Sequence, residues 1–281
     1  MRPILFLDEP HQPYPNEMDS AIFTKNEVEV IYTHFTKVQY DLYPNLKVVL
    51  CPCTGIKHLN PESQPGIRFI NLTDKEWLFD NVLSTAEWTV AAMFKLLRRN
   101  KDELNGKTIG FIGFGRVAQQ VTKMLSGFNV NIKYYDIETP KYYKGYAKFK
   151  NPISVLDADI ISVHLSENES TENFVNDALF DAMQTNSKPY FINSSRSSIV
   201  DGEYLVKSIA AQRFSGVMLD VVEDYSSEVV QKLLEYATDP LYNVFVTPHQ
   251  AGKGEVSRRN TDRYVFQELE KYYKNLKGEM I

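Results

Sequence analysis

A glycine-rich turn with an acidic residue beyond it is the stretch of this sequence whose spacing indicates chemistry most directly. Gly113, Gly115 and Ala118 have the G-x-G-x-x-G/A spacing and follow the apolar run Thr108–Ile112. Asp136 ends the next apolar run, about twenty positions after the second glycine. Such a turn aims helix-terminal N–H groups at a phosphate, and the acid reaches a ribose. The pattern predicts NAD binding. The alternative is a tight strand-to-helix turn without a ligand.

The acid also favours NAD over NADP. A phosphate on the adenosine ribose would meet the carboxylate of Asp136, and the next residues, Ile137 and Glu138, supply no arginine to receive it.

Two charged or titratable residues follow later apolar runs. Arg196 comes after Pro189–Asn193, and His249 comes after Val244–Thr247. Ligands of open parallel sheets bind beyond the carboxyl ends of the strands. A guanidinium pairs with a carboxylate in two places at once, and an imidazole exchanges protons near neutral pH. The alternatives are a solvated surface arginine and a structural histidine.

Apolar runs alternate with helical patterns along the whole chain, which indicates an α/β fold with parallel sheets. We expect a Rossmann-type doubly wound domain of about six strands over residues 84–255. A smaller, flavodoxin-like α/β domain would comprise 1–83 and 256–281 and bind the substrate. The expected strands are Ile4–Leu7, Val28–Tyr32, Leu46–Leu50, Thr108–Ile112, Asn131–Tyr135, Ala158–His164, Pro189–Asn193, Phe214–Val221 and Val244–Thr247.

Helix boundaries can be predicted at three places. Ser84 and Glu87 have capping-box spacing, so a helix should start after Ser84 and cross from the first domain into the second. Asp201 should cap a later helix. A long final helix from Glu255 should pack on the first domain. The stretch from Asp136 to about Lys150 is expected to be loop.

Composition excludes several classes of protein. The chain has 281 residues, is 43% hydrophobic and carries a net charge of −5. It therefore has no general attraction to nucleic acid or an anionic membrane. No apolar run is long enough to span a bilayer, and Met1–Asp8 is too short and too acidic for a signal peptide. With two cysteines, a cytoplasmic location is expected.

Those cysteines, Cys51 and Cys53, stand one residue apart with His58 nearby. The spacing does not fit a zinc site, so no metal is expected. The residues that follow, Thr54, Gly55 and Ile56, are expected to form a backbone loop whose N–H groups bind an anionic substrate.

An ordered series of motifs resembles the D-isomer-specific 2-hydroxyacid dehydrogenases, the family that includes phosphoglycerate dehydrogenase. The resemblance runs nearly end to end. It consists of Thr54-Gly55, S-x-A-E at Ser84–Glu87, G-F-G-R-V-A at 113–118 with Asp136, S-V-H-L at Ser162–Leu165, I-N-S-S-R at Ile192–Arg196, V-D at Val200-Asp201, L-D-V at Leu219–Val221 and T-P-H at Thr247–His249.

The resemblance implies an oxidoreductase that transfers a hydride between NAD(H) and a small 2-hydroxy or 2-oxo acid. Arg196 would hold the substrate carboxylate and keto oxygen, and His249 would pass a proton to or from the substrate oxygen. A homodimer is also implied. The expected cofactor contacts are Gly113, Gly115, Arg116, Val117, Asp136, Ser195, Asp220 and Gly252; the expected substrate contacts are Thr54, Gly55 and Ile56.

One departure from the family bears on turnover. The family carries a glutamate five residues after the L-D-V aspartate, where this chain has Tyr225. Glu223, Asp224 or Glu228 would have to replace it, and we favour Glu223. The departure motivates an alternative function, a catalytically weakened NAD(H)-binding sensor or partner protein. His164 matches a family position but is expected to pack, without a catalytic role.

Overall fold

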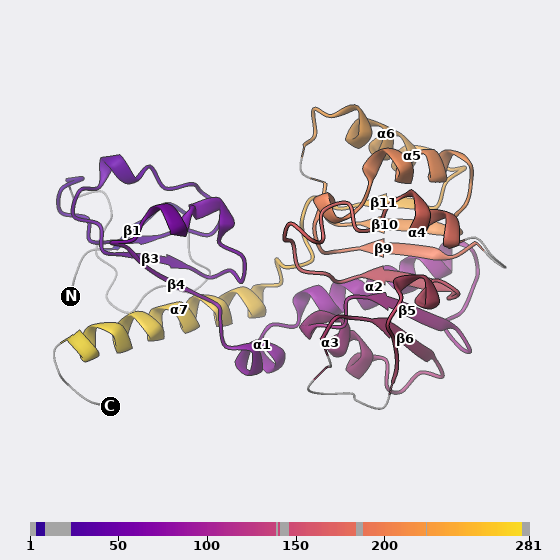
Figure 1. The fold of residues 1–281 in the computed structure, drawn as a ribbon, viewed down its shortest axis with the longest axis horizontal. Coiled ribbons are helices and arrows are strands. Elements are labelled where there is room, and N and C mark those ends of the chain that lie inside the picture. Colours follow the sequence, from indigo (N-terminus) through magenta and orange to yellow (C-terminus); the bar gives the residue numbers. More distant parts are fainter. Residues whose placement is uncertain are drawn as a thin grey trace. The chain divides into compact units, whose positions relative to one another are not determined.

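The computed structural model describes residues 4–8, 24–138, 140, 146–183, 188–222 and 224–276. The chain divides into two compact units (Figure 1). One comprises residues 1–82 with 255–281, and the other comprises 83–254. We describe each unit by itself.

Unit 83–254 is built on a parallel sheet that has seven strands in the described residues (Figure 1). The order β11-β10-β9-β8-β5-β6-β7 runs outward in both directions from the β5–β8 pair. This is the doubly wound arrangement, with its switch point between those two strands. The strands are β5 (Thr108–Ile112), β6 (Asn131–Tyr135), β7 (Ala147–Phe149), β8 (Ile160–Val163), β9 (Tyr190–Asn193), β10 (Gly216–Leu219) and β11 (Val244–Val246).

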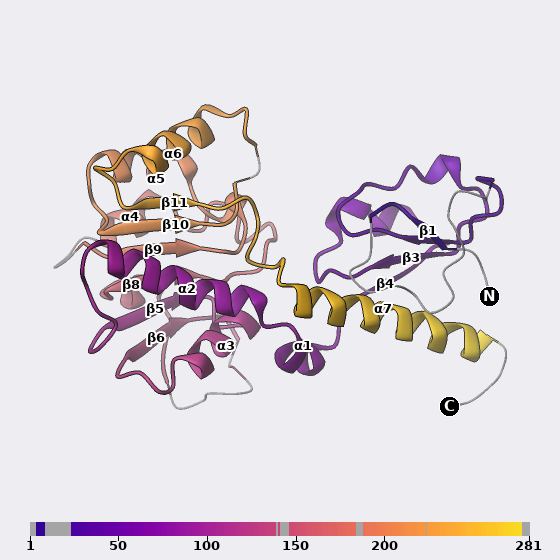
Figure 2. The ribbon, with the colours of Figure 1, turned by 180° about the vertical axis from the view of Figure 1, so that it is seen from behind.

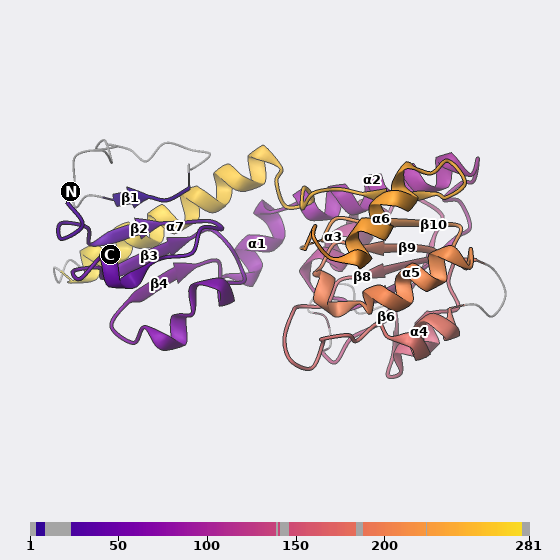
Figure 3. The same cartoon turned by 90° about the horizontal axis from the view of Figure 1, so that it is seen from above.

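Helices cover both faces of this sheet (Figure 3). One face packs against α2 (Ser84–Arg99) and α3 (Arg116–Met124) through a core that includes Phe111. The opposite face packs against α4 (Asp177–Ala182), α5 (Gly202–Ala210) and α6 (Glu228–Thr238). With both faces covered, the central strands β8, β9 and β10 are buried at every position, which accounts for their continuous apolar sequence.

Two predictions about α2 were wrong. The helix begins at Ser84 itself, with Leu83 at the N-cap position and no side-chain cap. Ser84 is buried, and a Cβ added at Gly254 would lie only 2.6 Å from the Cβ of Ser84. This serine therefore packs inside the unit. The helix also lies wholly within residues 83–254 and does not cross between the units.

Two other local predictions fared differently. The Asp201 cap is confirmed, because its carboxylate accepts the Tyr204 N–H at 2.9 Å just before α5. The expected loop up to Lys150 was wrong in part, since β7 pairs in parallel with β6 there. β7 is short and lies at the sheet edge, so its sequence lacks the buried apolar pattern that marks the central strands.

In its described residues, unit 1–82 with 255–281 contains a four-stranded parallel sheet in the order β1-β2-β3-β4. The chain's last described helix, α7 (Glu255–Leu276), packs on one face of it through Val265, Phe266 and Leu269, as expected (Figure 2). The other elements are β1 (Ile4–Phe6), β2 (Val30–Tyr32), β3 (Val48–Cys51), β4 (Arg68–Asn71) and α1 (Lys75–Asn81), with 3-10 turns at Tyr40–Leu42, Lys57–Leu59 and Pro61–Ser63.

No helix in the described ranges combines the length and the hydropathy needed to cross a lipid bilayer.

Candidate active site

The two glycines of the turn after β5 differ in what the structure requires of them. Gly113 has φ +89°, and a Cβ there would lie 2.7 Å from the backbone carbon of His164. Any other residue would be strained and would collide with the chain after β8. Gly115 is the N-cap of α3, and a Cβ there would meet nothing within 4 Å. The open space in front of the α3 amino end fits a phosphate group.

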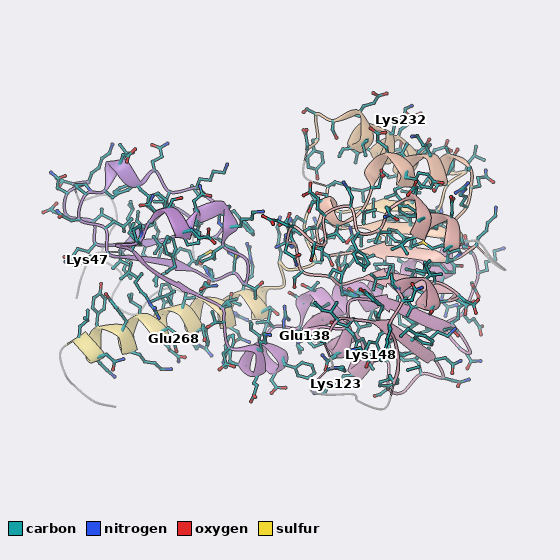
Figure 4. The ribbon with its side chains drawn as sticks, in the orientation of Figure 1. Lys47, Lys123, Glu138, Lys148, Lys232 and Glu268 are labelled. Carbon is teal, nitrogen blue, oxygen red and sulfur yellow. The ribbon has the colours of Figure 1, made fainter. Side chains whose placement is uncertain are left out.

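Asp136 joins the end of β6 to this turn. One carboxylate oxygen accepts the Phe114 N–H at 2.6 Å, and the other accepts the Glu138 N–H at 2.8 Å. Lys148 on β7 donates to the Glu138 carbonyl at 2.7 Å, which anchors the far side of the loop (Figure 4). The carboxylate is half-exposed, so it retains lone pairs that ribose hydroxyls can reach.

Arg116 and Val117 start α3 and are both half-buried. Arg116 Nη1 donates to Gln120 Oε1 at 3.1 Å, so the guanidinium lies along the first turn of the helix. Burial lowers the pKa of Arg116 to about 10, which leaves it charged at neutral pH. A positively charged side chain beside the amino end of a helix adds to the attraction that the helix dipole exerts on a pyrophosphate.

Arg196 lies in the loop after β9, and hydrogen bonds with neighbouring residues of the loop fix its position. Arg196 Nη1 donates to the Ser195 carbonyl at 2.7 Å, and its backbone carbonyl accepts from Asn193 Nδ2 at 3.0 Å. Ser195 donates its N–H to Asn193 Oδ1 and its hydroxyl to the Val163 carbonyl, both at 2.9 Å. The turn is therefore tied to the ends of β8 and β9, with the Arg196 side chain 37% exposed.

Glu167 lies beside Arg196 and was missed by the sequence reasoning. Its Oε2 is 3.9 Å from Arg196 Nε, and its Oε1 accepts the Ser198 hydroxyl at 2.8 Å. The available signal was an acid three residues after His164, in the loop at the carboxyl end of a strand. The carboxylate reduces the positive potential that an anionic ligand of Arg196 would meet.

Asp220 fixes the backbone around His249. This buried carboxylate accepts N–H groups from Gln250 at 2.6 Å and Ala251 at 2.7 Å, and the hydroxyl of Thr247. The Asp220 carbonyl accepts the His249 N–H at 2.8 Å. His249 has φ +52°, a left-handed conformation that is rare outside glycine. These four hydrogen bonds to Asp220 thus fix the segment that carries a strained, half-buried histidine just after β11.

His164 has a different environment. Its Nε2 is 2.8 Å from the Ser162 hydroxyl, and its ring packs against Phe111. Burial lowers the pKa of His164 from 6.5 to about 3, so the ring is neutral at physiological pH. It supports the turn at Gly113 through its backbone.

Of the three acids expected near His249, Asp224 and Glu228 lie in the described residues. Asp224 accepts the N–H and hydroxyl of Ser226, at 3.0 and 2.6 Å, and is exposed. These hydrogen bonds lower the pKa of Asp224, which fixes it as a turn-stabilising carboxylate. Glu228 begins α6 and is also exposed. Glu223 lies outside the described residues.

The remaining predicted site residues are Gly252, which directly follows Ala251, and the loop Thr54, Gly55 and Ile56. Gly252 is exposed, and a Cβ there would meet only Thr85 Oγ1, at 3.9 Å. Thr54 and Gly55 are exposed, and Ile56 is half-buried, in the loop after β3 of the other unit. An exposed loop at the carboxyl end of a strand is accessible to a small anion.

Comparison with known proteins bears on these arrangements. Residues 77–251 match the model of the D-isomer specific 2-hydroxyacid dehydrogenase, NAD binding domain. The chain is 30% identical over 238 residues to the putative 2-hydroxyacid dehydrogenase YoaD of Bacillus subtilis, covering 85% of this chain and 62% of that protein. It is 28% identical over 269 residues to D-3-phosphoglycerate dehydrogenase of Haemophilus influenzae, with 86% and 62% covered.

The fold is similar to that of D-lactate dehydrogenase from Aquifex aeolicus complexed with NAD and lactic acid. The TM-score is 0.76, with 92% of this chain and 87% of that chain covered, and at 24% identity the likeness shows the fold alone. The chain spans about three fifths of the length of the two curated relatives. With an NAD-binding family model matched over most of its length, the chain belongs to the D-isomer-specific 2-hydroxyacid dehydrogenases.

Proposed function

We propose that this chain is an NAD-dependent dehydrogenase that interconverts a small 2-oxo acid and the D-2-hydroxy acid. One observation carries the proposal. Loops after β9 and β11 present Arg196 and His249 at the same edge of the sheet as the Gly113–Gly115 turn, and buried groups hold each loop.

The residues that fit NAD are those of the turn and the strand after it. Gly115 leaves room for the pyrophosphate beside the α3 amino end and Arg116, and Asp136 fits the ribose hydroxyls. We assign Val117, Ser195, Asp220 and Gly252 to the same contact set, as the family resemblance implies. When bound, NAD(H) supplies or accepts the hydride.

This chain's own residues bind the substrate and move its proton. The Arg196 guanidinium pairs with the substrate carboxylate, and its fixed planar geometry orients the adjacent carbonyl. His249 donates a proton to the carbonyl oxygen during reduction and accepts it during oxidation. We assign to Glu223 the role of orienting His249. We assign to Thr54, Gly55 and Ile56 the binding of the rest of the substrate.

The test is NADH consumption with a panel of short 2-oxo acids, including glyoxylate, pyruvate and hydroxypyruvate. We expect the protein to oxidise NADH with at least one of these acids. His249→Gln should lower kcat about 100-fold or more while NADH affinity stays unchanged. Arg196→Gln should raise the substrate KM, with Arg98→Gln on α2 as the matched surface control. Tight NADH binding without turnover on any acid would support a sensor and overturn the proposal.

A further inference from the structure

Two thiols lie side by side at the end of β3, outside the dinucleotide-binding unit. Cys51 and Cys53 are both free cysteines. Their sulfurs contact the same backbone oxygen, the carbonyl of His34, at 3.8 and 3.6 Å. Cys51 is 1% exposed, and Cys53 is half-buried. The two thiols also hydrogen-bond to each other, so the sulfurs are neighbours, and Cys53 is the more accessible of the two.

The backbone between them is already bent. Cys53 donates its N–H to the Cys51 carbonyl at 2.7 Å, a three-residue γ-turn centred on Pro52. The proline ring fixes φ near the value that this turn needs. The turn shortens the separation of the two Cα atoms and keeps both side chains on the His34 side. A disulfide requires Cα atoms within about 7 Å, which neighbouring residues of a γ-turn satisfy.

The surroundings favour a thiolate at Cys53. Hydrogen bonds from the Cys51 thiol and the His34 side chain, with the charge of His58, lower the pKa of Cys53. The His58 Nε2 atom is buried and has no hydrogen-bond partner within the described residues. An unpartnered buried imidazole nitrogen beside a thiol is suited to accept its proton. The thiolate is the form that reacts with electrophiles and oxidants.

We propose that Cys51 and Cys53 form a hydroperoxide-sensitive dithiol, in which Cys53 is oxidised first and Cys51 resolves it as an intrachain disulfide. Among the described residues no group of three or more His, Cys, Asp or Glu side chains could hold a metal ion.

The chemistry balances with a hydroperoxide as the oxidant. The Cys53 sulfur attacks the outer peroxide oxygen, so an S–O bond forms, the O–O bond breaks and an alcohol leaves. The product is a sulfenic acid. The Cys51 sulfur then attacks Cys53, forming the S–S bond and releasing water. Two thiols lose two electrons, and the hydroperoxide is reduced to an alcohol and water.

The proposal is tested by peptide mass spectrometry on the full chain. Lys47 and Lys57 are tryptic sites, so one peptide, Val48–Lys57, carries both cysteines. After brief exposure to tert-butyl hydroperoxide, this peptide should be lighter by two hydrogen atoms and should resist alkylation. Reduction with dithiothreitol should reverse both changes, so that the original mass and the reactivity toward alkylation return.

Variants assign the two roles. Cys51→Ser should stop at the sulfenic acid, which dimedone traps at position 53, and Cys53→Ser should give no adduct at position 51. His58→Gln should slow oxidation several-fold, while Lys57→Arg, at its exposed neighbour, keeps the tryptic site and serves as the control. In unfolded protein, iodoacetamide should label both cysteines equally; in folded protein, Cys53 should react at least tenfold faster.

Two results would overturn the proposal. One is an unchanged Val48–Lys57 peptide after excess hydroperoxide, with circular dichroism showing folded protein. The other is equal labelling of both cysteines in the folded chain. Neither readout needs catalytic activity, so the outcome is independent of the proposed dehydrogenase function.

Discussion

Two aspartates at the same edge of the sheet hold loops by similar means but in different environments. Asp136 follows β6 and accepts two backbone N–H groups, from Phe114 and Glu138, while half-exposed. Asp220 follows β10 and accepts two backbone N–H groups and a hydroxyl while 1% exposed.

The difference in burial indicates a difference in task. A half-exposed carboxylate fixes its turn and remains available to a ligand, because it has about four lone-pair sites. A buried carboxylate must be satisfied by the protein, since an unpaired buried charge is costly. Asp136 therefore belongs chiefly to ligand binding, and Asp220 chiefly to the position of His249.

The largest expected effect is at Asp220. Asp220→Ala removes the acceptor for Gln250, Ala251 and Thr247, so the strained His249 backbone relaxes. We expect kcat to fall about 100-fold and the free energy of unfolding to fall by about 3 kcal/mol. Turnover assays and urea denaturation measure both. Wild-type kcat in a folded Asp220→Ala protein would contradict the assigned task.

Asp136→Ala is the matched substitution on the other loop. The turn loses two partly exposed hydrogen bonds, so unfolding free energy should change by only about 1 kcal/mol. The dissociation constant for NADH, measured by fluorescence titration, should rise about tenfold or more. Asp136→Ser should also improve NADPH use relative to NADH. Equal stability losses in the two alanine variants would remove the distinction between the loops.

The two aspartates also differ in how far the sequence predicts their contacts. The Gly113, Gly115 and Asp136 pattern is local and depends on backbone geometry, so spacing alone reveals it. The Asp220 contacts join β10 to residues about thirty positions later, and Glu167 meets Arg196 from another loop. Such pairings arise from strand order, which periodicity does not encode.

The failures have equally physical causes. Ser84 and Glu87 have the spacing of a capping box, but burial of Ser84 inside the unit overrides the local preference. β7 was missed because a short edge strand has no alternating or continuous apolar pattern.

His164 directly follows β8, which lies between β6 and β10 in the sheet, and it predicts a pH effect on stability. Its folded pKa is lowered from 6.5 to about 3, so the unfolded chain binds a proton that the folded chain does not. Stability therefore falls as pH drops from about 6.5 toward 3. Urea unfolding at several pH values should show this slope, and His164→Gln should flatten it. The same slope in both proteins would place the effect elsewhere.

The smallest expected effect is at Glu167. Glu167→Gln keeps the size of the side chain and removes a negative charge 3.9 Å from Arg196. The KM for an anionic 2-oxo acid should fall about threefold, and more for a dianionic one, with kcat little changed. Steady-state kinetics at low and high salt measure this, and Glu203→Gln on α5 is the exposed control. A rise in KM would mean that Glu167 chiefly orients the guanidinium.

The most direct measurement follows one atom. Reduction of a 2-oxo acid by NADH carrying two deuterium atoms at nicotinamide C4 should give a 2-hydroxy acid with one deuterium at C2 in the D configuration, detected by chiral chromatography and mass spectrometry. His249→Gln should form this product more slowly, by about 100-fold or more, without loss of NADH binding. A product without deuterium at C2, or of L configuration, would contradict the account.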